Sequence, residues 1–463
     1  MADRGGARGP DRATVVDITR PSIHWQSASS EERHRKNLLR NRSAANSLVA
    51  SISRTVSLRY DRDPHMTQKF FFSTGIENSY PTISSGRRID EMEKCSHYAR
   101  YSEDFALVRE TGIDTLRYGP AYYRTHAAPD RFDWSSADDP MHLLRQLNIE
   151  VIADLCHFGV PDWLGGFQDP AFPVLFADYA RAFARRYPWV RYYTPVNEIF
   201  ICASFSALRG YWNECLQSES AFVTALRNLC MAHELAVDTI LAERPDAIIV
   251  QSESLEHFHP AGRKATGHAD RENAFKHLSL DLTLGHELDA GMAGFLNANG
   301  VTSNDLSFFR ERRAVGQRWL GMDYYPTCEH SVASTGRTTT RWNGHGFFSL
   351  AAEYYNRYRI PLFHCETNRT SRHAVEWLES QWSDVLALRN AGIPVHGFTW
   401  YSLTDQIDWQ HALRVERNDV HRVGLYDLDR KIRPVGEAYR ELIARYSPRL
   451  GRDEPVLALA LEA

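Results

Sequence analysis

Eight short apolar runs, separated by longer amphipathic stretches, limit the folds that this chain can adopt. Most of the runs are apolar without alternation, such as AIIV at 247–250, which is typical of parallel β-strands covered on both faces. The predicted strands span residues 70–77, 114–120, 150–158, 192–198, 247–253, 319–325, 361–367 and 394–403.

The stretches between these runs predict helices. Residues 102–111 place Phe105 and Val108 on one face, and residues 175–187 and 221–243 also have apolar residues at helical spacing. Strands that alternate with helices indicate an α/β protein, and eight such units predict a single closed (β/α)8 barrel, or TIM barrel. An open doubly wound sheet is the alternative. No G-x-G-x-x-G follows the first predicted strand, which disfavours a dinucleotide-binding form of that sheet.

Composition excludes several classes of protein. With 24% charged and 43% hydrophobic residues, the chain is neither fibrous nor wholly disordered. The net charge of −4 gives no reason to expect nucleic acid as a partner. The sequence has no run of 18 apolar residues that would predict a membrane span. It also lacks the basic start and apolar stretch of a secretory signal, so we expect no membrane partner.

The seven cysteines are scattered, odd in number and without a C-x-x-C pair. This pattern is typical of buried thiols in a reducing compartment and does not indicate a disulfide framework or a zinc site. We therefore expect a cytoplasmic protein.

The first 65 residues differ from the rest in composition. They contain 12 basic and 7 acidic residues, a net charge of +5, and little apolar periodicity. They predict a disordered basic extension outside the fold. A transit peptide is an alternative that the acidic residues disfavour, and a translation start at Met66 is another. The expected units are the extension at 1–65, the barrel at 66–450 and a C-terminal tail at 451–463.

Two carboxylates stand at the ends of predicted strands. Glu198 ends the fourth strand and Glu366 ends the seventh. Because the carboxyl ends of barrel strands hold the active site, both side chains are candidate catalytic groups. Opposed carboxylates suit cleavage of a glycosidic bond: one protonates the leaving oxygen, and the other attacks the anomeric carbon or activates water. The structural alternative is that each pairs with an arginine such as Arg117.

Five segments carry a family resemblance. T-P-V-N-E at 194–198 and H-C-E-T-N at 364–368 contain the two carboxylates. The others are H-Y-A-R-Y-S-E-D-F-A-L-V-R-E-T-G-I at 97–113, D-L-C-H-F-G-V-P-D-W-L at 154–164 and Y-S-L-T-D-Q-I-D-W at 401–409. In this order, the chain resembles glycoside hydrolase family 1, whose members are retaining β-glucosidases and β-galactosidases built on a (β/α)8 barrel.

The resemblance implies a role for each matching residue. Glu366 would be the nucleophile and Glu198 the acid/base, and Arg117 and Tyr324 would hold Glu366 in its ionised form. The residues implied in substrate binding are His157, Asn197, Tyr324, Tyr401, Asp408 and Trp409. Of these, Asn197 would bind the sugar 2-hydroxyl. A carboxyl separation near ~5 Å would accompany retention, and ~8 Å or more would indicate inversion.

The chain departs from the family pattern around the sugar site. Four family positions carry other residues here: Pro81 for Gln, Tyr401 for Trp, Asp408 for Glu and Arg369 for Gly. Sites that hydrogen-bond hydroxyl groups discriminate strongly between sugars, so we expect an atypical glycone, such as a deoxy, amino or otherwise modified sugar. His421-Arg422-Val423 replaces the Lys-x-Tyr of the family's 6-phospho branch, and we expect a solvated loop there.

These observations predict a retaining β-glycosidase that hydrolyses an O-glycosidic bond of a small carbohydrate or glycoside through a covalent intermediate. A transglycosidase would share that intermediate, whereas a catalytically silent sugar-binding barrel would not need both carboxylates. A metal-dependent barrel enzyme is a further alternative. No H-x-H or clustered Asp/His ligand set stands at the end of a single predicted strand, so we expect no metal and no cofactor.

Overall fold

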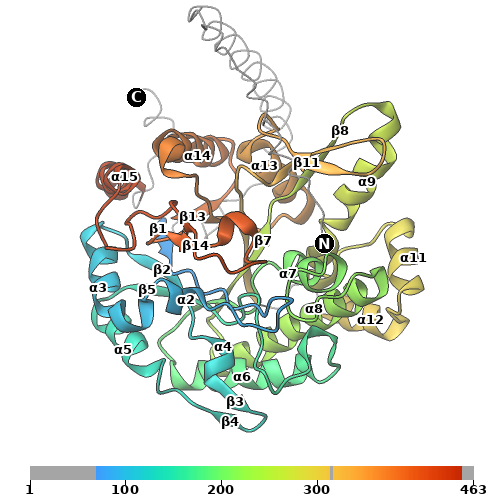
Figure 1. Cartoon of the computed structure of the whole chain (residues 1–463), viewed down its shortest axis with the longest axis horizontal. Helices are drawn as coiled ribbons and strands as arrows, with labels where there is room; N and C mark the ends of the chain where they lie inside the picture. The colour runs from blue at the N-terminus through green and yellow to red at the C-terminus, as the bar shows by residue number, and fades with distance from the viewer. Residues whose placement is uncertain (1–68, 313–315, 451–463) are drawn as a thin grey trace, which may run out of the picture. The chain divides into compact units, whose positions relative to one another are not determined.

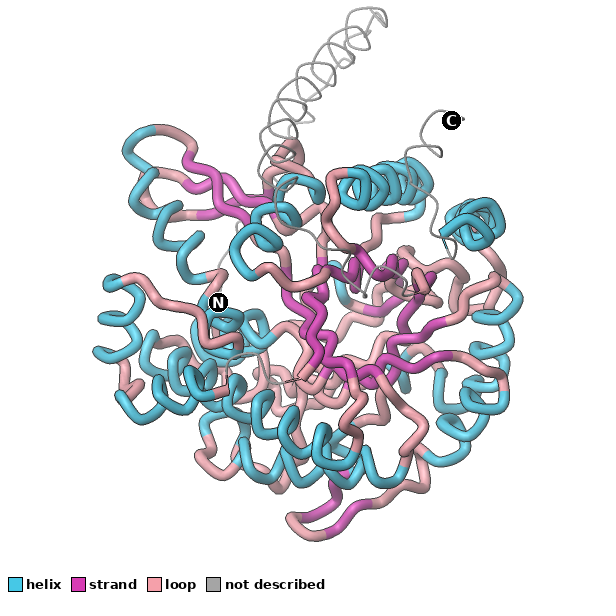
Figure 2. The backbone as a smooth tube through the Cα atoms, turned by 180° about the vertical axis from the view of Figure 1, so that it is seen from behind, coloured by secondary structure: helices cyan, strands magenta, loops and turns pink. Residues whose placement is uncertain are grey.

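The protein is represented by a computed structural model that describes residues 69–312 and 316–450. Within these ranges, eight parallel strands close a barrel in the order β1-β13-β12-β9-β7-β6-β5-β2 (Figures 1 and 2). The strands are β1 (Phe71–Gly75), β2 (Thr115–Tyr118), β5 (Glu150–Asp154), β6 (Tyr192–Thr194), β7 (Ile248–Ser254), β9 (Gln317–Asp323), β12 (Leu362–Glu366) and β13 (Val395–Trp400). Each overlaps one predicted strand, so the predicted (β/α)8 barrel is confirmed.

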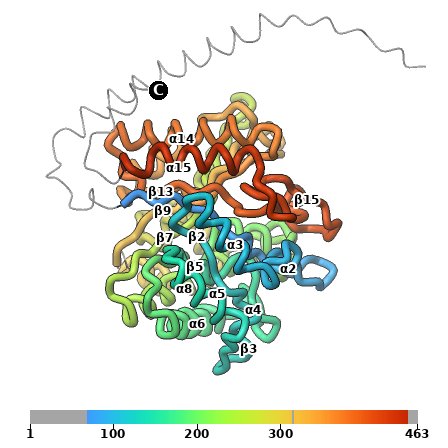
Figure 3. Tube along the Cα trace, turned by 90° about the vertical axis from the view of Figure 1, so that its left-hand side faces the viewer, coloured from blue at the N-terminus to red at the C-terminus, as the bar shows by residue number. Residues whose placement is uncertain are grey.

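Helices surround this barrel, including the three that the sequence predicts. α3 (His97–Glu110) begins before the predicted start at residue 102, while α6 (Phe172–Arg186) and α8 (Glu219–Glu243) lie close to their predicted limits. The others are α2 (Glu91–Lys94), α4 (Tyr122–Thr125), α5 (Asp138–Gln146), α7 (Ile199–Ala203), α9 (Thr266–Phe275), α10 (Leu278–Thr283), α11 (Ala290–Ala298), α12 (Ser303–Glu311), α13 (Phe347–Tyr358), α14 (Ala374–Asn390) and α15 (Pro434–Leu450). Figure 3 shows α14 and α15 side by side next to β13.

Local signals explain where the long helix α8 begins and how it is held. The side chain of Ser218 accepts a hydrogen bond from the Ala221 amide over 3.1 Å, which caps the first turn. Further along, Glu234 receives two hydrogen bonds from Arg318 of β9, at 2.9 and 2.8 Å. Because both side chains are buried, this bidentate pair joins helix to strand without leaving an unpaired charge.

A cluster of mostly bulky side chains fills the interior of the barrel. It comprises Phe71, Ile152, Tyr192, Ile248, Val250, Trp319, Phe363 and Cys365. Trp319 stacks on Phe363 with ring centroids 6.0 Å apart. The barrel interior is therefore a packed core and not a pore.

A small sheet outside the barrel follows two of its strands. β8 (His257–Pro260) comes after β7, β10 (Glu329–Val332) comes after β9, and β11 (Thr338–Thr340) completes the order β11-β10-β8. Figure 1 shows β8 and β11 projecting beside α9. β8 contains an H-x-H pair, His257-Phe258-His259, so the expectation that no such pair follows a barrel strand is wrong. The pair does not lie at the end of β7 itself. It lies in β8, a separate strand that begins three residues after β7 ends.

Two further strand pairs lie in loops: β3 (His126–Ala128) with β4 (Arg131–Phe132), and β14 (Gln406–Ile407) with β15 (Val420–His421). No helix among the described residues is long and apolar enough to cross a bilayer. The predicted extension at 1–65 and the predicted tail at 451–463 lie outside the described residues.

Candidate active site

A cavity of about 750 Å³ lies at the carboxyl ends of the barrel strands. Glu366, the last residue of β12, and Glu198, which lies between β6 and α7, both line it. Aromatic side chains form much of the remaining wall: Phe158, Phe200, Phe205, Tyr211, Tyr325, Trp342 and Trp409. The two candidate catalytic carboxylates therefore share one space that is large enough for a glycoside.

An irregularity in strand pairing turns Glu366 toward this cavity. The register between β12 and β9 shifts between His364 and Glu366. The preceding residue, Cys365, belongs to the interior cluster of the barrel, so two consecutive side chains face inward. A bulge re-aims side chains in this way, and bulges are common beside active sites.

Two donors hold the carboxylate of Glu366. Arg117 of β2 forms a buried ion pair with one oxygen, as predicted. The hydroxyl of Tyr325 donates to the other oxygen over 2.6 Å. Charge-assisted hydrogen bonds to both oxygens stabilise the negative charge and fix the orientation of the side chain.

Tyr324 does not hold Glu366, and this part of the prediction is wrong. Its hydroxyl donates to Glu329 over 2.9 Å, and its ring stacks on Trp377 with centroids 5.8 Å apart. Successive side chains of an extended chain point to opposite faces, so only one of two adjacent tyrosines can face the cavity. That residue is Tyr325.

A buried network extends from Arg117 to the predicted sugar-binding residues. Arg117 donates to Asp154 over 3.1 Å and to the side-chain oxygen of Asn197 over 2.7 Å. Nδ1 of His157 lies 2.7 Å from the Asp154 carboxylate. The side-chain nitrogen of Asn197 lies 3.2 Å from Nε2 of His157. Because the Asn197 amide donates to Nε2, the histidine proton lies on Nδ1. The network thus orients His157 and Asn197 relative to Glu366.

The environment of Glu198 favours the protonated form of its carboxyl group. Its backbone is left-handed, with a φ of 41°, where the chain turns from β6 into α7. Burial, followed by the carboxyl groups of Asp323 and Glu366, raises the pKa of Glu198 well above its usual range. A buried acid of raised pKa can donate a proton at neutral pH, which is what a leaving oxygen requires.

The other predicted substrate-binding residues divide into two groups. His157 and Trp409 line the cavity. Buried around it, but not among its lining residues, are Asn197, Tyr324, Tyr401 and Asp408. The ring of Tyr401 packs against Arg117, with its centroid 5.5 Å from the guanidinium carbon, so Tyr401 supports the network.

Asp408 has a different contact from the one expected. Its carboxylate accepts backbone hydrogen bonds from three consecutive residues, 417–419, at 2.9–3.0 Å. A carboxylate that already accepts three amide hydrogen bonds holds a loop and has little capacity left for a sugar hydroxyl. Asp408 therefore holds residues 417–419 in place, and its binding of the glycone stays a prediction.

Glu77 and Gln406 are functional candidates that the predicted site omits. Both line the cavity, and Nε2 of Gln406 donates to Glu77 over 2.8 Å. The other oxygen of Glu77 accepts the Ser79 amide over 3.0 Å. Burial raises the pKa of Glu77. Glu77 ends the first predicted strand, and this position was a usable signal, because active-site groups gather at strand ends.

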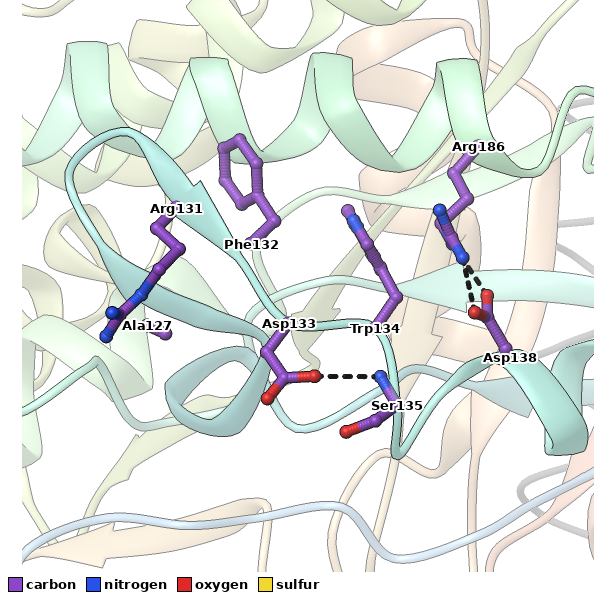
Figure 4. Close-up of a pocket in the computed structure, with 8 residues that line it drawn as sticks. All are labelled: Ala127, Arg131, Phe132, Asp133, Trp134, Ser135, Asp138 and Arg186. Carbon is purple, nitrogen blue, oxygen red and sulfur yellow. Dashed lines mark hydrogen bonds and ion pairs between the residues drawn. The ribbon is translucent and has the colours of Figure 1, made fainter.

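A second recess lies beside the β3–β4 hairpin and is shown in Figure 4. Two pairs of its polar residues bond to each other. Asp133 accepts the amide of Ser135 over 3.0 Å, and Arg186 pairs with Asp138, at 2.6 Å for Nε. The first contact shapes the turn after β4 and the second joins α6 to α5, so most polar groups drawn in Figure 4 are already engaged.

The cavity at the strand ends combines a carboxylate held by two donors with a carboxyl group whose pKa is raised. This pairing suits hydrolysis of a glycosidic bond. A family model described as glycosyl hydrolase family 1 matches residues 80–327. The chain belongs to glycosyl hydrolase family 1. It is thus a glycoside hydrolase of the β-glucosidase type.

The relatives of this family 1 enzyme are distant in sequence. A β-glucosidase of Agrobacterium sp. is 22% identical over 371 residues, which cover 71% of this chain and 80% of the relative. The 6-phospho-β-glucosidase AscB of Escherichia coli is 25% identical over 400 residues, covering 75% and 83%. A solved β-glucosidase of Thermotoga maritima in complex with glucoimidazole superposes with a TM-score of 0.70 at 16% identity, covering 83% and 99%.

The adjacent tyrosines of this family 1 enzyme offer a matched pair of variants. Tyr325→Phe removes one hydrogen bond to the charged Glu366, which is worth about 1.5–3 kcal/mol, so we expect kcat/KM to fall about 10–100-fold. Tyr324→Phe loses only its bond to Glu329, and kcat/KM should change far less. Steady-state kinetics of both variants check this, and equal losses would contradict the assignment.

Proposed function

We propose that this family 1 enzyme is a retaining β-glycosidase with an atypical glycone. The observation that carries the proposal is the contrast between two carboxyl groups of one cavity. Glu366 accepts hydrogen bonds from Arg117 and Tyr325, whereas burial and neighbouring carboxyl groups raise the pKa of Glu198. A carboxylate held by two donors beside a carboxyl group of raised pKa is suited to the nucleophile and acid roles.

In the proposed first step, Glu366 attacks the anomeric carbon while Glu198 transfers its proton to the departing oxygen. The glycosidic bond breaks, an ester forms between the sugar and Glu366, and the aglycone leaves as an alcohol. In the second step, the Glu198 carboxylate takes a proton from water, whose oxygen displaces Glu366 from the sugar. Glu198 regains its proton, and the anomeric configuration is retained after two inversions.

The proposed roles of the surrounding residues follow from their contacts. Asn197 and His157 would meet the sugar hydroxyl groups next to the reacting carbon, since both belong to the network that holds Glu366 through Arg117. Trp409 would stack on the sugar. Its indole nitrogen is buried without a partner among the described residues, so it is also free to donate to a hydroxyl group.

Three features of the far side of the sugar site support an atypical glycone. Asp408 is committed to a loop, Gln406 and Glu77 bond to each other within the cavity, and position 81 is a proline, which has no side-chain donor. The family pattern has a glutamine at position 81 and a glutamate at position 408. The residues present here therefore offer the sugar a different set of hydrogen-bond donors and acceptors. A polar site of this kind rejects a wrong hydroxyl pattern by large factors.

The test is covalent trapping with a panel of 2-deoxy-2-fluoro aryl glycosides, including glucoside, galactoside, deoxysugar and 6-phosphoglucoside forms. We expect one of the unusual sugars to inactivate the enzyme and to label the peptide that contains Glu366. The Glu366→Gln variant is the control and should take up no label. Label on another residue would overturn the nucleophile assignment, and fast turnover of plain aryl β-glucosides would overturn the atypical glycone.

A further inference from the structure

Three histidines meet outside the catalytic cavity. His257 and His259 belong to β8, and His345 comes from the loop between β11 and α13. One ring nitrogen of each lies within 4.8 Å of those of the other two. The ring centroids are 4.5–4.7 Å apart in all three pairs. The three imidazoles therefore form a compact cluster whose ring nitrogens could share one ion.

Strand register separates this cluster from the catalytic cavity. Phe258 of β8 pairs with His330 of β10, and both side chains line the cavity. The alternate residues, His257 and His259, must point to the other face of the same sheet. The small sheet thus carries the cavity wall on one face and the three-histidine cluster on the other.

Glu329 stands behind the cluster. It pairs with His257 in the β8–β10 register, so its side chain lies on the same face of the sheet. One carboxylate oxygen lies 2.6 Å from Nε2 of His259 and accepts the backbone amide of His345, also over 2.6 Å. A metal-binding histidine commonly donates its second ring N–H to a carboxylate, which fixes the orientation of the ring.

The loop that carries His345 is shaped around the same carboxylate. The amide of Gly346 donates to Glu329 over 2.9 Å. A Cβ atom at Gly344 would lie 1.8 Å from Glu329 Oε2, so this close approach requires glycine. Backbone contacts therefore bring His345 to the two strand histidines.

A lysine lies beside the cluster. The ammonium group of Lys276 is 3.4 Å from Nδ1 of His257. Lys276 also pairs with Glu353 over 3.0 Å, and this carboxylate offsets its charge.

We propose that His257, His259 and His345 bind one divalent transition-metal ion of the Zn²⁺ class, with Glu329 as the carboxylate behind His259. Three imidazoles form a recognised ligand set for Zn²⁺, and an exposed third ligand leaves the fourth position to water. The ion would join β8 to the loop that also carries Trp342, an exposed residue at the cavity wall. Its role would be to fix that wall.

The test uses the full chain, free of any histidine tag and stripped with a chelator. Calorimetric titration with Zn²⁺ should give one tight equivalent, and Co²⁺ should give the visible absorption of a nitrogen-ligated site. His257→Asn and His345→Asn should each weaken Zn²⁺ binding by at least about 100-fold, and Glu329→Gln by about 10–100-fold. His268→Asn, at an exposed position on the neighbouring α9, is the matched control and should bind as the parent does.

A measurement on the unaltered protein covers the case in which a variant fails to fold. At a Zn²⁺ concentration 100 times the Kd, only about 1% of the site is free. Modification of His345 by diethyl pyrocarbonate, followed by peptide mass spectrometry, should then slow about 100-fold, while that of His268 should not. Equal modification rates with and without Zn²⁺, or variants that bind Zn²⁺ like the parent, would overturn the proposal.

Discussion

Replacing Glu366 by glutamine is expected to lower kcat by about 10⁴-fold or more, because the reaction loses its nucleophile. Glutamine keeps an acceptor oxygen for Arg117 and fills the same volume, so the loss should come from chemistry and not from unfolding. This matters because a buried arginine that loses its partner costs about 3–5 kcal/mol of stability. Steady-state kinetics and a thermal unfolding curve of the same preparation separate the two effects.

Glu366→Ala supports a second, positive measurement. The smaller side chain leaves room for azide, which can attack the anomeric carbon as the aryl leaving group departs. The product should be a glycosyl azide of inverted, α configuration, identified by NMR. The control is Glu256→Gln, which changes another carboxylate of the same cavity and should cost far less activity. A β-configured azide, or no difference between the two variants, would contradict the proposed role of Glu366.

The barrel could be predicted from the sequence because buried parallel strands leave a local mark. Most of the eight strands are apolar runs that can be recognised from the local sequence. Glu198 and Glu366 could be found because charges at the ends of such runs are costly unless they have a use. The start of a helix has a weaker local signal: α3 begins at His97, well before the apolar spacing at 102–111.

The alternation of side chains along β9 distinguishes Tyr325 from Tyr324. The interior cluster includes Trp319, and Asp323 lies within hydrogen-bond distance of Ser252 inside the barrel. These odd-numbered residues of β9 mark its inner face. Counting the alternation forward assigns Tyr325 to the cavity and Tyr324 to the surrounding helices.

Other features depend on contacts that no local pattern records. The register shift that turns Glu366 inward belongs to the pairing of β12 with β9 and not to either strand alone. The contact of Asp408 with residues 417–419 depends on how a loop folds back. The three-histidine cluster joins residues about 90 positions apart, and only the small sheet brings them together. Long-range contacts of this kind are what the sequence pattern leaves open.

Replacing Glu198 by glutamine is expected to lower kcat/KM by about 10²–10⁴-fold for substrates with poor leaving groups. With a dinitrophenyl glycoside the loss should be small, because that leaving group departs without a proton. The ratio of the two losses is therefore the measurement. Equal losses on both substrates would mean that Glu198 acts by a route other than proton donation.

The pH profile of the unaltered enzyme should carry the same information. Glu198 works as an acid only while protonated, so its raised pKa keeps activity high at neutral pH and makes it fall as pH rises through that pKa. Asp323→Asn removes the carboxyl group that, after burial, contributes most to the raised pKa of Glu198. Its amide can still hydrogen-bond to Ser252, so the fold should persist. We expect the alkaline limb of kcat/KM to move to lower pH in this variant and to vanish with dinitrophenyl glycosides in Glu198→Gln. A limb that stays in place in both variants would assign that ionisation to another group.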